Sequence, residues 1–139
     1  MTNVSQIMTI GVEYAEDTDS IINVAKRLAV ADIGAVPVCD KHGLLKGIVT
    51  DRDIVVRVVA LGLDTRQTKV GVLADQDNVV AIGVDDDIRE AVEVMKTHKV
   101  RRLPVLDGDR VVGVLSQADL AGSLPEADFS NLLAVISSS

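Results

Sequence analysis

The sequence predicts an α+β fold made of two similar units, each with the element order β-α-β-β-α. A Pro-Val strand followed by Gly-x-x-Thr/Ser-x-x-Asp occurs twice in the chain, which indicates an internal repeat. Apolar residues recur at helical spacing before each copy. With 139 residues, 47% of them hydrophobic, the chain is long enough to bury a substantial core.

The two copies align over two stretches. Residues 33–38 (IGAVPV) match residues 100–105 (VRRLPV), which lie 67 positions further on. Residues 47–53 (GIVTDRD) match residues 113–119 (GVLSQAD) at an offset of 66, after a deletion of one residue. We therefore divide the chain into three parts, namely a first repeat at 1–66, a second repeat at 67–125 and a C-terminal tail at 126–139.

Each repeat begins with a short strand and an amphipathic helix. The helices follow from apolar residues at spacing i, i+3, i+4, i+7, starting at Ile21 and at Ile88. Acidic and hydroxyl side chains just before them are typical of helix N-caps. The strands are expected near residues 12–14 and 79–82, and a last helix is expected in the tail at 128–136.

A β-hairpin and a second helix complete each repeat. The hairpin strands are predicted at 35–39 and 45–49, and at 102–106 and 110–115, with polar, Gly-containing turns between them. The following helices open at Thr50 and at Ser116. Since proline has no N–H, Pro37 and Pro104 predict strands that run along a sheet edge or begin at the proline.

Composition excludes several classes of function. The chain has 14 Lys and Arg against 21 Asp and Glu, a formal charge of −7, which argues against nucleic-acid binding through phosphate neutralisation. The apolar stretch at 54–63 is about half the ~20 residues that a membrane-spanning helix needs. Cys39 is the only cysteine, so no internal disulfide forms, and the start of the chain lacks a secretory signal pattern. We expect a cytoplasmic protein.

The two Pro-Val strands and the two Gly-x-x-Thr/Ser-x-x-Asp motifs resemble the CBS domain, over residues 3 to 124. The chain is most similar to small stand-alone members, such as the actinobacterial hypoxic response proteins. The resemblance implies two CBS repeats packed as a pseudo-two-fold pair. It also implies a regulatory sensor that binds an adenine nucleotide (AMP, ADP or ATP), requires no other cofactor and performs no catalysis.

The resemblance also implies the site residues. Asp53 and Asp119 would hold the ribose hydroxyls, with Thr50 and Ser116 close to ribose or phosphate. A carboxylate has two oxygens that can accept both hydroxyl protons of a ribose. The adenine edge would be read by the strand backbone at Ala35-Val36 and at Arg102-Leu103.

Phosphate requires cations, and the two repeats differ in them. Arg101 and Arg102 precede the second Pro-Val strand, whereas Gly34 and Ala35 stand at the equivalent positions of the first. Arg52 and Lys69 are candidates to compensate in the first repeat. The sequence therefore predicts two unequal sites, although each arginine has a plain alternative as a solvated surface charge. The resemblance also implies that phosphate can be reached from the opposite repeat, so the arginines are not assigned to one site each.

A structural alternative remains open for the motifs. Thr50-x-x-Asp53 and Ser116-x-x-Asp119 also fit N-terminal capping boxes, in which the hydroxyl and the acid only satisfy backbone N–H groups. On that interpretation the protein is a ligand-free scaffold for dimerisation or protein docking. The sequence shows no nucleophile with a base placed to activate it, so we expect no enzyme. Cys39-x-x-His42 has no second pair of metal ligands, so we expect no metal site.

A homodimer is expected because residues 54–59 and 120–121 offer more apolar surface than one helix face can bury. The candidate partners are therefore an adenine nucleotide, a second copy of the chain and a protein target of the regulatory module.

Overall fold

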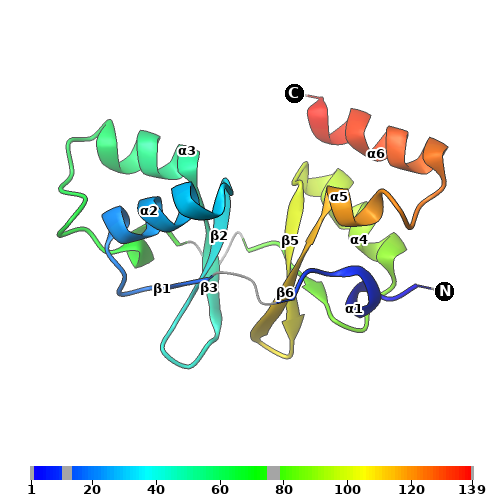
Figure 1. Cartoon of the computed structure of the whole chain (residues 1–139), viewed down its shortest axis with the longest axis horizontal. Helices are drawn as coiled ribbons and strands as arrows, with labels where there is room; N and C mark the ends of the chain where they lie inside the picture. The colour runs from blue at the N-terminus through cyan, green and yellow to red at the C-terminus, as the bar shows by residue number, and fades with distance from the viewer. Residues whose placement is uncertain (1, 11–13, 75–78, 139) are drawn as a thin grey trace. The chain divides into compact units, whose positions relative to one another are not determined.

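In the computed structural model, which describes residues 2–10, 14–74 and 79–138, the chain forms two compact units. Residues 13–79 form one unit, and residues 80–139 form the other together with residues 1–12. Each unit contains one three-stranded sheet with helices packed against it (Figure 1). The α+β class predicted from the sequence is confirmed.

The unit of residues 13–79 follows the predicted element order. Its sheet has the order β1-β2-β3, with β1 parallel to β2 and β3 antiparallel to β2. Side chains from the sheet and from the helices form one aliphatic core, in which Ile21, Val38 and Val58 are fully buried. The elements are β1 (Ala15–Glu16), α2 (Ile21–Ala31), β2 (Ala35–Cys39), β3 (Leu45–Thr50), α3 (Asp51–Ile54), the π-helical turn η1 (Val55–Val59) and the 3₁₀ turn η2 (Val70–Leu73).

The second unit repeats this arrangement with the sheet order β4-β5-β6. Its core includes the fully buried Met95, Leu103 and Leu120. The predicted tail helix is present as α6, which contacts α4 and buries Leu132. The elements are α1 (Val4–Ile7), β4 (Ile82–Gly83), α4 (Ile88–His98), β5 (Arg102–Asp107), β6 (Arg110–Ser116), α5 (Gln117–Leu120) and α6 (Glu126–Ser137).

The helix starts and hairpin turns form for the reasons expected from the sequence. The Ser20 hydroxyl accepts a hydrogen bond from the N–H of Asn23, and the Asp87 carboxylate accepts one from the N–H of Arg89. Gly43 and Gly108 adopt positive φ angles of 81° and 63° in the two hairpin turns. The Asp40 carboxylate accepts hydrogen bonds from the N–H groups of Leu44 and His42, and the first of these is the main cause that lowers its pKa.

Two predictions about strands need correction. Of the strand expected at 12–14, residues 12 and 13 lie outside the described residues, and the strand found, β1, begins at Ala15. The prolines do not lie on edge strands, because β2 and β5 are the central strands and begin two residues before the prolines.

The register explains how a central strand tolerates proline. The N–H of Asp51 bonds the carbonyl of Gly34, so in the antiparallel β2–β3 ladder alternate pairs exchange hydrogen bonds and the Pro37–Ile48 pair does not. The nitrogen of Pro37 therefore points away from β3, and the pairing of β2 with β1 starts only at Val38. Pro104 and Val114 have the same relation in the second sheet.

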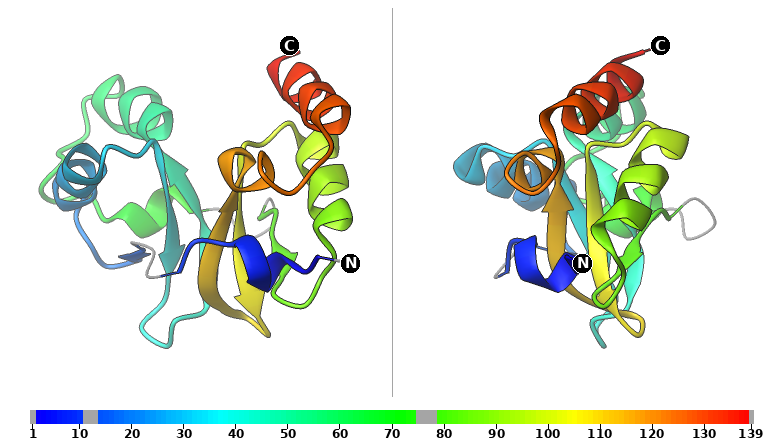
Figure 2. Two further views of the ribbon diagram at one scale, coloured as in Figure 1. Left: turned by 45° about the vertical axis from the view of Figure 1, so that its right-hand side comes forward. Right: turned by 90° about the vertical axis from the view of Figure 1, so that its right-hand side faces the viewer.

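The first residues of the chain belong to the second unit, although the sequence division assigns them to the first repeat. Val4 is fully buried in the core of that unit, and its N–H donates to the carbonyl of Asp86 at 2.8 Å. Both views in Figure 2 show α1 beside the sheet that contains β6. This contact is non-local, so helix periodicity and turn signals do not report it.

Candidate functional site

Each Gly-x-x-Thr/Ser-x-x-Asp motif forms the corner where a strand ends and a short helix begins. In the first unit, the Thr50 hydroxyl accepts from the N–H of Asp53 at 3.0 Å, and Oδ2 of Asp53 accepts from the N–H of Thr50 at 2.9 Å. In the second unit, the same two bonds join Ser116 and Asp119 at 3.2 and 2.9 Å. Both motifs are therefore complete capping boxes, as the structural alternative predicts.

The start of the Pro-Val strand lies directly beside each corner. Ala35 pairs with Thr50, and Arg102 pairs with Ser116. The structure thus brings together the residues predicted to read the base and those predicted to hold the ribose, within each unit. Val36 and Leu103 are 3% and 0% exposed as whole residues, backbone included, so the structure does not present them to a ligand.

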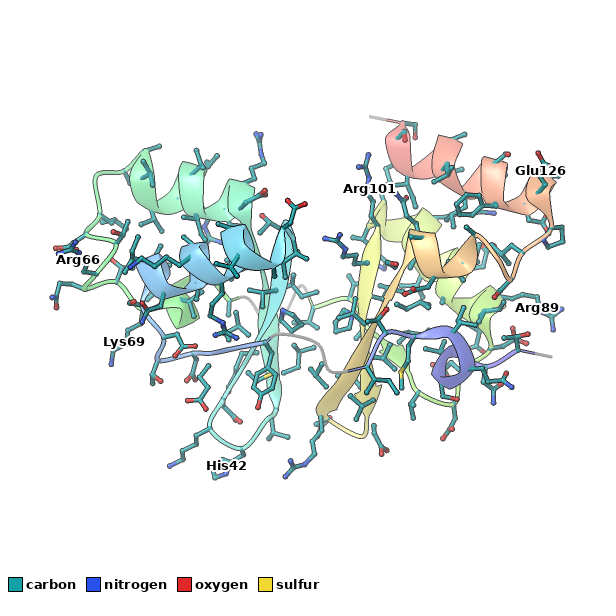
Figure 3. All side chains as sticks on the ribbon, viewed as in Figure 1. His42, Arg66, Lys69, Arg89, Arg101 and Glu126 are labelled. Carbon is teal, nitrogen blue, oxygen red and sulfur yellow. The ribbon has the colours of Figure 1, made fainter. Side chains whose placement is uncertain are left out.

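The predicted phosphate ligands are exposed arginines. Arg52, Arg101 and Arg102 lie on the surface, and none forms an ion pair with another described residue. Figure 3 shows Arg101 at the end of the second sheet where β5 begins, which is the end that carries the Ser116 corner. The first unit has no cation at the equivalent positions, because Gly34 and Ala35 occupy them.

Lys69 does not lie in the Thr50–Asp53 corner. It lines a cavity of about 490 Å³ together with Lys46, near the start of β3, and with Asp17 and Thr18, which follow β1. No residue of the motif lines this cavity. The prediction that Lys69 supplies phosphate binding beside Asp53 is therefore not supported.

One contact at the second corner was missed by the sequence analysis. The Thr9 hydroxyl donates to Oδ1 of Asp119 at 3.4 Å, and Thr9 pairs with Val114 of β6 in an isolated antiparallel bridge. Thr9 and Asp119 are 110 residues apart. A single sequence carries no signal for such a contact.

The described residues do not gather a set of metal ligands. Residues 2–10, 14–74 and 79–138 contain no group of three His, Cys, Asp or Glu side chains placed to hold one ion. His42 is exposed at the tip of the first hairpin, as Figure 3 shows. Cys39 is buried, and burial, followed by the nearby Asp40 carboxylate, raises its pKa to about 11.

A comparison with protein families shows which family the chain belongs to. The CBS domain family matches residues 4–60 and again residues 72–126, which is most of the sequence. This chain belongs to the CBS domain family. The resemblance inferred from the two motifs is confirmed, and the two matches correspond to the two repeats. No catalytic family is indicated.

Known CBS proteins show the same architecture. Hypoxic response protein 1 of Mycobacterium tuberculosis is 38% identical over 126 residues, which cover 91% of this chain and 87% of that protein. The crystal structure of Hypoxic Response Protein I with two coordinated zinc ions is 37% identical, with a TM-score of 0.81, over 89% of this chain and 100% of that one. The structure of CBSX2 in complex with AMP is 20% identical, with a TM-score of 0.76, over 88% and 96% of the two chains, and supports the fold.

Among the residues that the structure describes, no helix is long and apolar enough to cross a membrane.

Proposed function

We propose that this CBS protein is a regulatory module that binds an adenine nucleotide at one or both motif corners and does not transform it. The observation that carries the proposal is that the capping box leaves hydrogen-bond acceptors of the motif carboxylate unused. The capping box uses only Oδ2 of Asp53, and its Oδ1 has no partner among the described residues. A half-buried carboxylate with free acceptor sites is suited to the two hydroxyls of a ribose.

The second corner is the better candidate for a phosphorylated ligand. Arg102 is the strand residue that pairs with Ser116, and Arg101 precedes it. Guanidinium groups form strong charge-assisted hydrogen bonds with phosphate. In the first repeat, Arg52 lies within the motif, and Gly34 and Ala35 stand at the positions of Arg101 and Arg102. We therefore expect AMP, ADP or ATP to bind the second corner more tightly than the first. The AMP complex of CBSX2 makes AMP the first ligand to test.

The proposal includes no catalysis and a cytoplasmic location. His42 lies at a hairpin tip and His98 at the end of α4, and both are exposed, so neither is held beside a nucleophile by the elements described. Cys39 is buried and protonated at neutral pH. The module would then act through a conformational or assembly change that a separate protein target reads.

A second candidate function is a scaffold that binds no nucleotide. It is favoured by the capping boxes, which are complete without a ligand, and by exposed apolar side chains on η1 and just after it. Val55, Val56 and Val59 are 57%, 46% and 56% exposed. Such a surface suits association with a second copy of the chain, and a nucleotide-binding homodimer would combine both candidates.

The test must separate the capping role of each motif aspartate from its role in ligand binding. Substitution of the aspartate by asparagine does this. In Asp53→Asn and Asp119→Asn, the amide oxygen can still accept the N–H of the N-cap residue, but the side chain loses its charge and half of its acceptors. We expect the double variant to melt within a few degrees of the wild type and to bind AMP at least tenfold more weakly, because a hydrogen bond to a charged group contributes about 1.5–3 kcal/mol.

Calorimetry with AMP, ADP and ATP measures the affinities, with CMP as the control nucleotide. The single variants assign the sites, and only Asp119→Asn should matter if the second corner dominates. Adenine-nucleotide binding that is equal in the wild type and the double variant would show that the site is misplaced. No adenine-nucleotide binding to the wild type would favour the scaffold.

A further inference from the structure

A cavity of about 490 Å³ in the unit of residues 13–79 contains two lysines and no residue of the motif corners. Lys46 belongs to the edge strand β3, and Lys69 immediately precedes η2. The other lining residues come from the turn after β1 and from η2 and its end, and they are Asp17, Thr18, Gly71, Val72 and Ala74. Small-molecule sites in proteins have volumes of about 300–1,000 Å³, so the cavity is large enough for a small ligand.

A backbone contact fixes the walls of this cavity, and the second unit repeats it. The N–H of Gly71 donates to the carbonyl of Asp17 at 3.0 Å, which joins η2 to the turn after β1. In the second unit, the N–H of Ser5 donates to the carbonyl of Val84 at 3.1 Å and joins α1 to the turn after β4. The two units therefore use the same backbone frame at this place.

The lysines are not part of that shared frame. Lys69 and Asn3 occupy the same place in the two units, because each forms an isolated bridge with the N-cap residue of the long helix of its unit. Val112 occupies the place of Lys46, because each directly precedes the glycine of its motif. The second unit folds with an amide and a valine at these two places, so the frame does not require cations there.

Neither lysine forms an ion pair with an acidic side chain. Within residues 2–10, 14–74 and 79–138, the ion pairs include neither Lys46 nor Lys69, and they do not include the Asp17 carboxylate. The cavity thus has two positive charges against one negative charge, in a chain whose formal charge is −7. An excess of one sign of charge along a concave surface attracts a ligand of the opposite sign.

We propose that this cavity is a further ligand site of the module, for a phosphate monoester of a small polyol. The ammonium groups of Lys46 and Lys69 bind the phosphate, since lysine binds phosphate as a point charge. The Asp17 carboxylate accepts hydrogen bonds from the hydroxyl groups of the ligand, and its charge disfavours an anion that has none. The site is separate from the Thr50–Asp53 corner, because Thr50 lies four residues from Lys46 along β3, about 13 Å at roughly 3.3 Å per residue.

Nuclear magnetic resonance of the whole protein, titrated with glycerol 3-phosphate, tests the site. We expect saturable shifts of the backbone amide signals of Thr18, Gly71 and Val72, which line the cavity. The amide signals of the two motif corners should not shift. A titration without saturable shifts at the cavity, or with shifts at the corners instead, would overturn the proposal.

The two lysines are tested together in Lys46→Gln/Lys69→Gln. We expect this variant to bind glycerol 3-phosphate at least about tenfold more weakly, because it loses the charge-assisted hydrogen bonds to the phosphate. The matched control is Lys26→Gln/Lys41→Gln, which removes the same charge from two exposed positions of the same unit outside the cavity. Salt screens distant surface charges, so the control should bind within about twofold of the wild type. Equal losses in the two variants would indicate unspecific attraction and overturn the site.

A comparison of two ligands tests the role of Asp17. Inorganic phosphate lacks the carbon-bound hydroxyls, so it should bind the wild type about threefold or more weakly than glycerol 3-phosphate does. Asp17→Ala removes both the acceptor and the repulsive charge, and the ratio of the two affinities should then fall towards one. An unchanged ratio in this variant, or tighter binding of inorganic phosphate to the wild type, would overturn the assignment of a polyol phosphate.

The double variant Asp53→Asn/Asp119→Asn separates this inference from the proposed function. It changes the motif corners and leaves the cavity intact, so its affinity for glycerol 3-phosphate should equal that of the wild type, whether or not nucleotides bind the corners. A loss of this binding would overturn the separate site. In the same variant, AMP and a phosphoserine peptide test the other sources of a phosphate monoester. Tighter binding of either one at the cavity would overturn the assignment to a small polyol.

Discussion

At the scale of single residues, Cys39 gives a prediction about pH and reactivity. Burial, and then the charge of Asp40, raises the pKa of the thiol from 9.0 to about 11. A group whose pKa is raised by folding contributes stability below its unfolded pKa and loses that contribution as the pH rises through its folded value. Cys39 therefore favours the folded state up to about pH 9, and this contribution disappears towards pH 11.

We expect iodoacetamide to label Cys39 slowly at pH 8 in the folded protein and quickly in urea. The shift in pKa lowers the thiolate fraction about 100-fold at this pH, and burial blocks access as well. Mass spectrometry of labelled protein over time measures both rates, with Cys39→Ser as the unlabelled control. Equal rates with and without urea would contradict the buried position of Cys39.

The site residues differ in how far the sequence reveals them. The Thr50–Asp53 and Ser116–Asp119 pairs are predictable because a capping box joins residues three apart, and the repeat shows it twice. The pairing of Ala35 with Thr50 follows from the hairpin. Thr9 is not predictable, because its contact with Asp119 depends on the docking of a distant segment on a sheet edge.

At the scale of elements, both long repeat helices end in a strained conformation. The C-cap residues Asp32 and Lys99, which are 67 positions apart, adopt left-handed backbone angles with φ of 54° and 53°. Residues with a Cβ pay roughly 1–2 kcal/mol in this region, and glycine is the usual choice. The strain is repeated at the same place in the two copies, so it belongs to the way each helix turns into its central strand.

We expect Lys99→Gly to raise the free energy of unfolding by about 0.5–1 kcal/mol. Glycine removes the left-handed strain, and its greater freedom in the unfolded chain cancels part of the gain. Urea unfolding followed by circular dichroism measures the change. Lys99→Ala is the control, because alanine keeps the strain and should give no gain; equal stability of the glycine and alanine variants would argue against strain at this cap.

Element prediction succeeded where the information is local. Helices α2 and α4 and both hairpins follow from periodicity, caps and turn residues within a few positions. The prediction that Pro37 and Pro104 lie on edge strands or begin their strands was wrong, because a sequence does not state how many strands flank a given strand. Their positions are nevertheless ones at which the ladder needs no N–H, as predicted. The π-helical turn at Val55–Val59 was not predicted, since its i→i+5 bond, from Ala60 N–H to the Val55 carbonyl, has no distinct side-chain pattern.

At the scale of the whole molecule, the helices that follow the two hairpins, α3 and α5, differ in how much apolar surface they and the residues after them expose. In the second unit, Leu120 is fully buried in the core, so it is not available for the association surface expected at 120–121. In the other unit, α3 continues into η1 and leaves apolar side chains exposed. We call this set the η1 patch, and it comprises Val55, Val56, Val59, Leu61 and Leu63, which are 45–68% exposed.

We expect the protein to be a homodimer that buries the η1 patch, and Val55→Glu/Val59→Glu to make it monomeric. These two residues are one helical turn apart and are more than half exposed, so the charges cost little in the isolated chain and much in an apolar interface. The matched control is Val30→Glu, because Val30 is 89% exposed on α2 and lies outside the patch. Light scattering at micromolar concentration should give the mass of two chains for the wild type and the control, and of one chain for the double variant. A wild type with the mass of one chain would refute the homodimer, and a double variant that remains dimeric would place the interface on another surface.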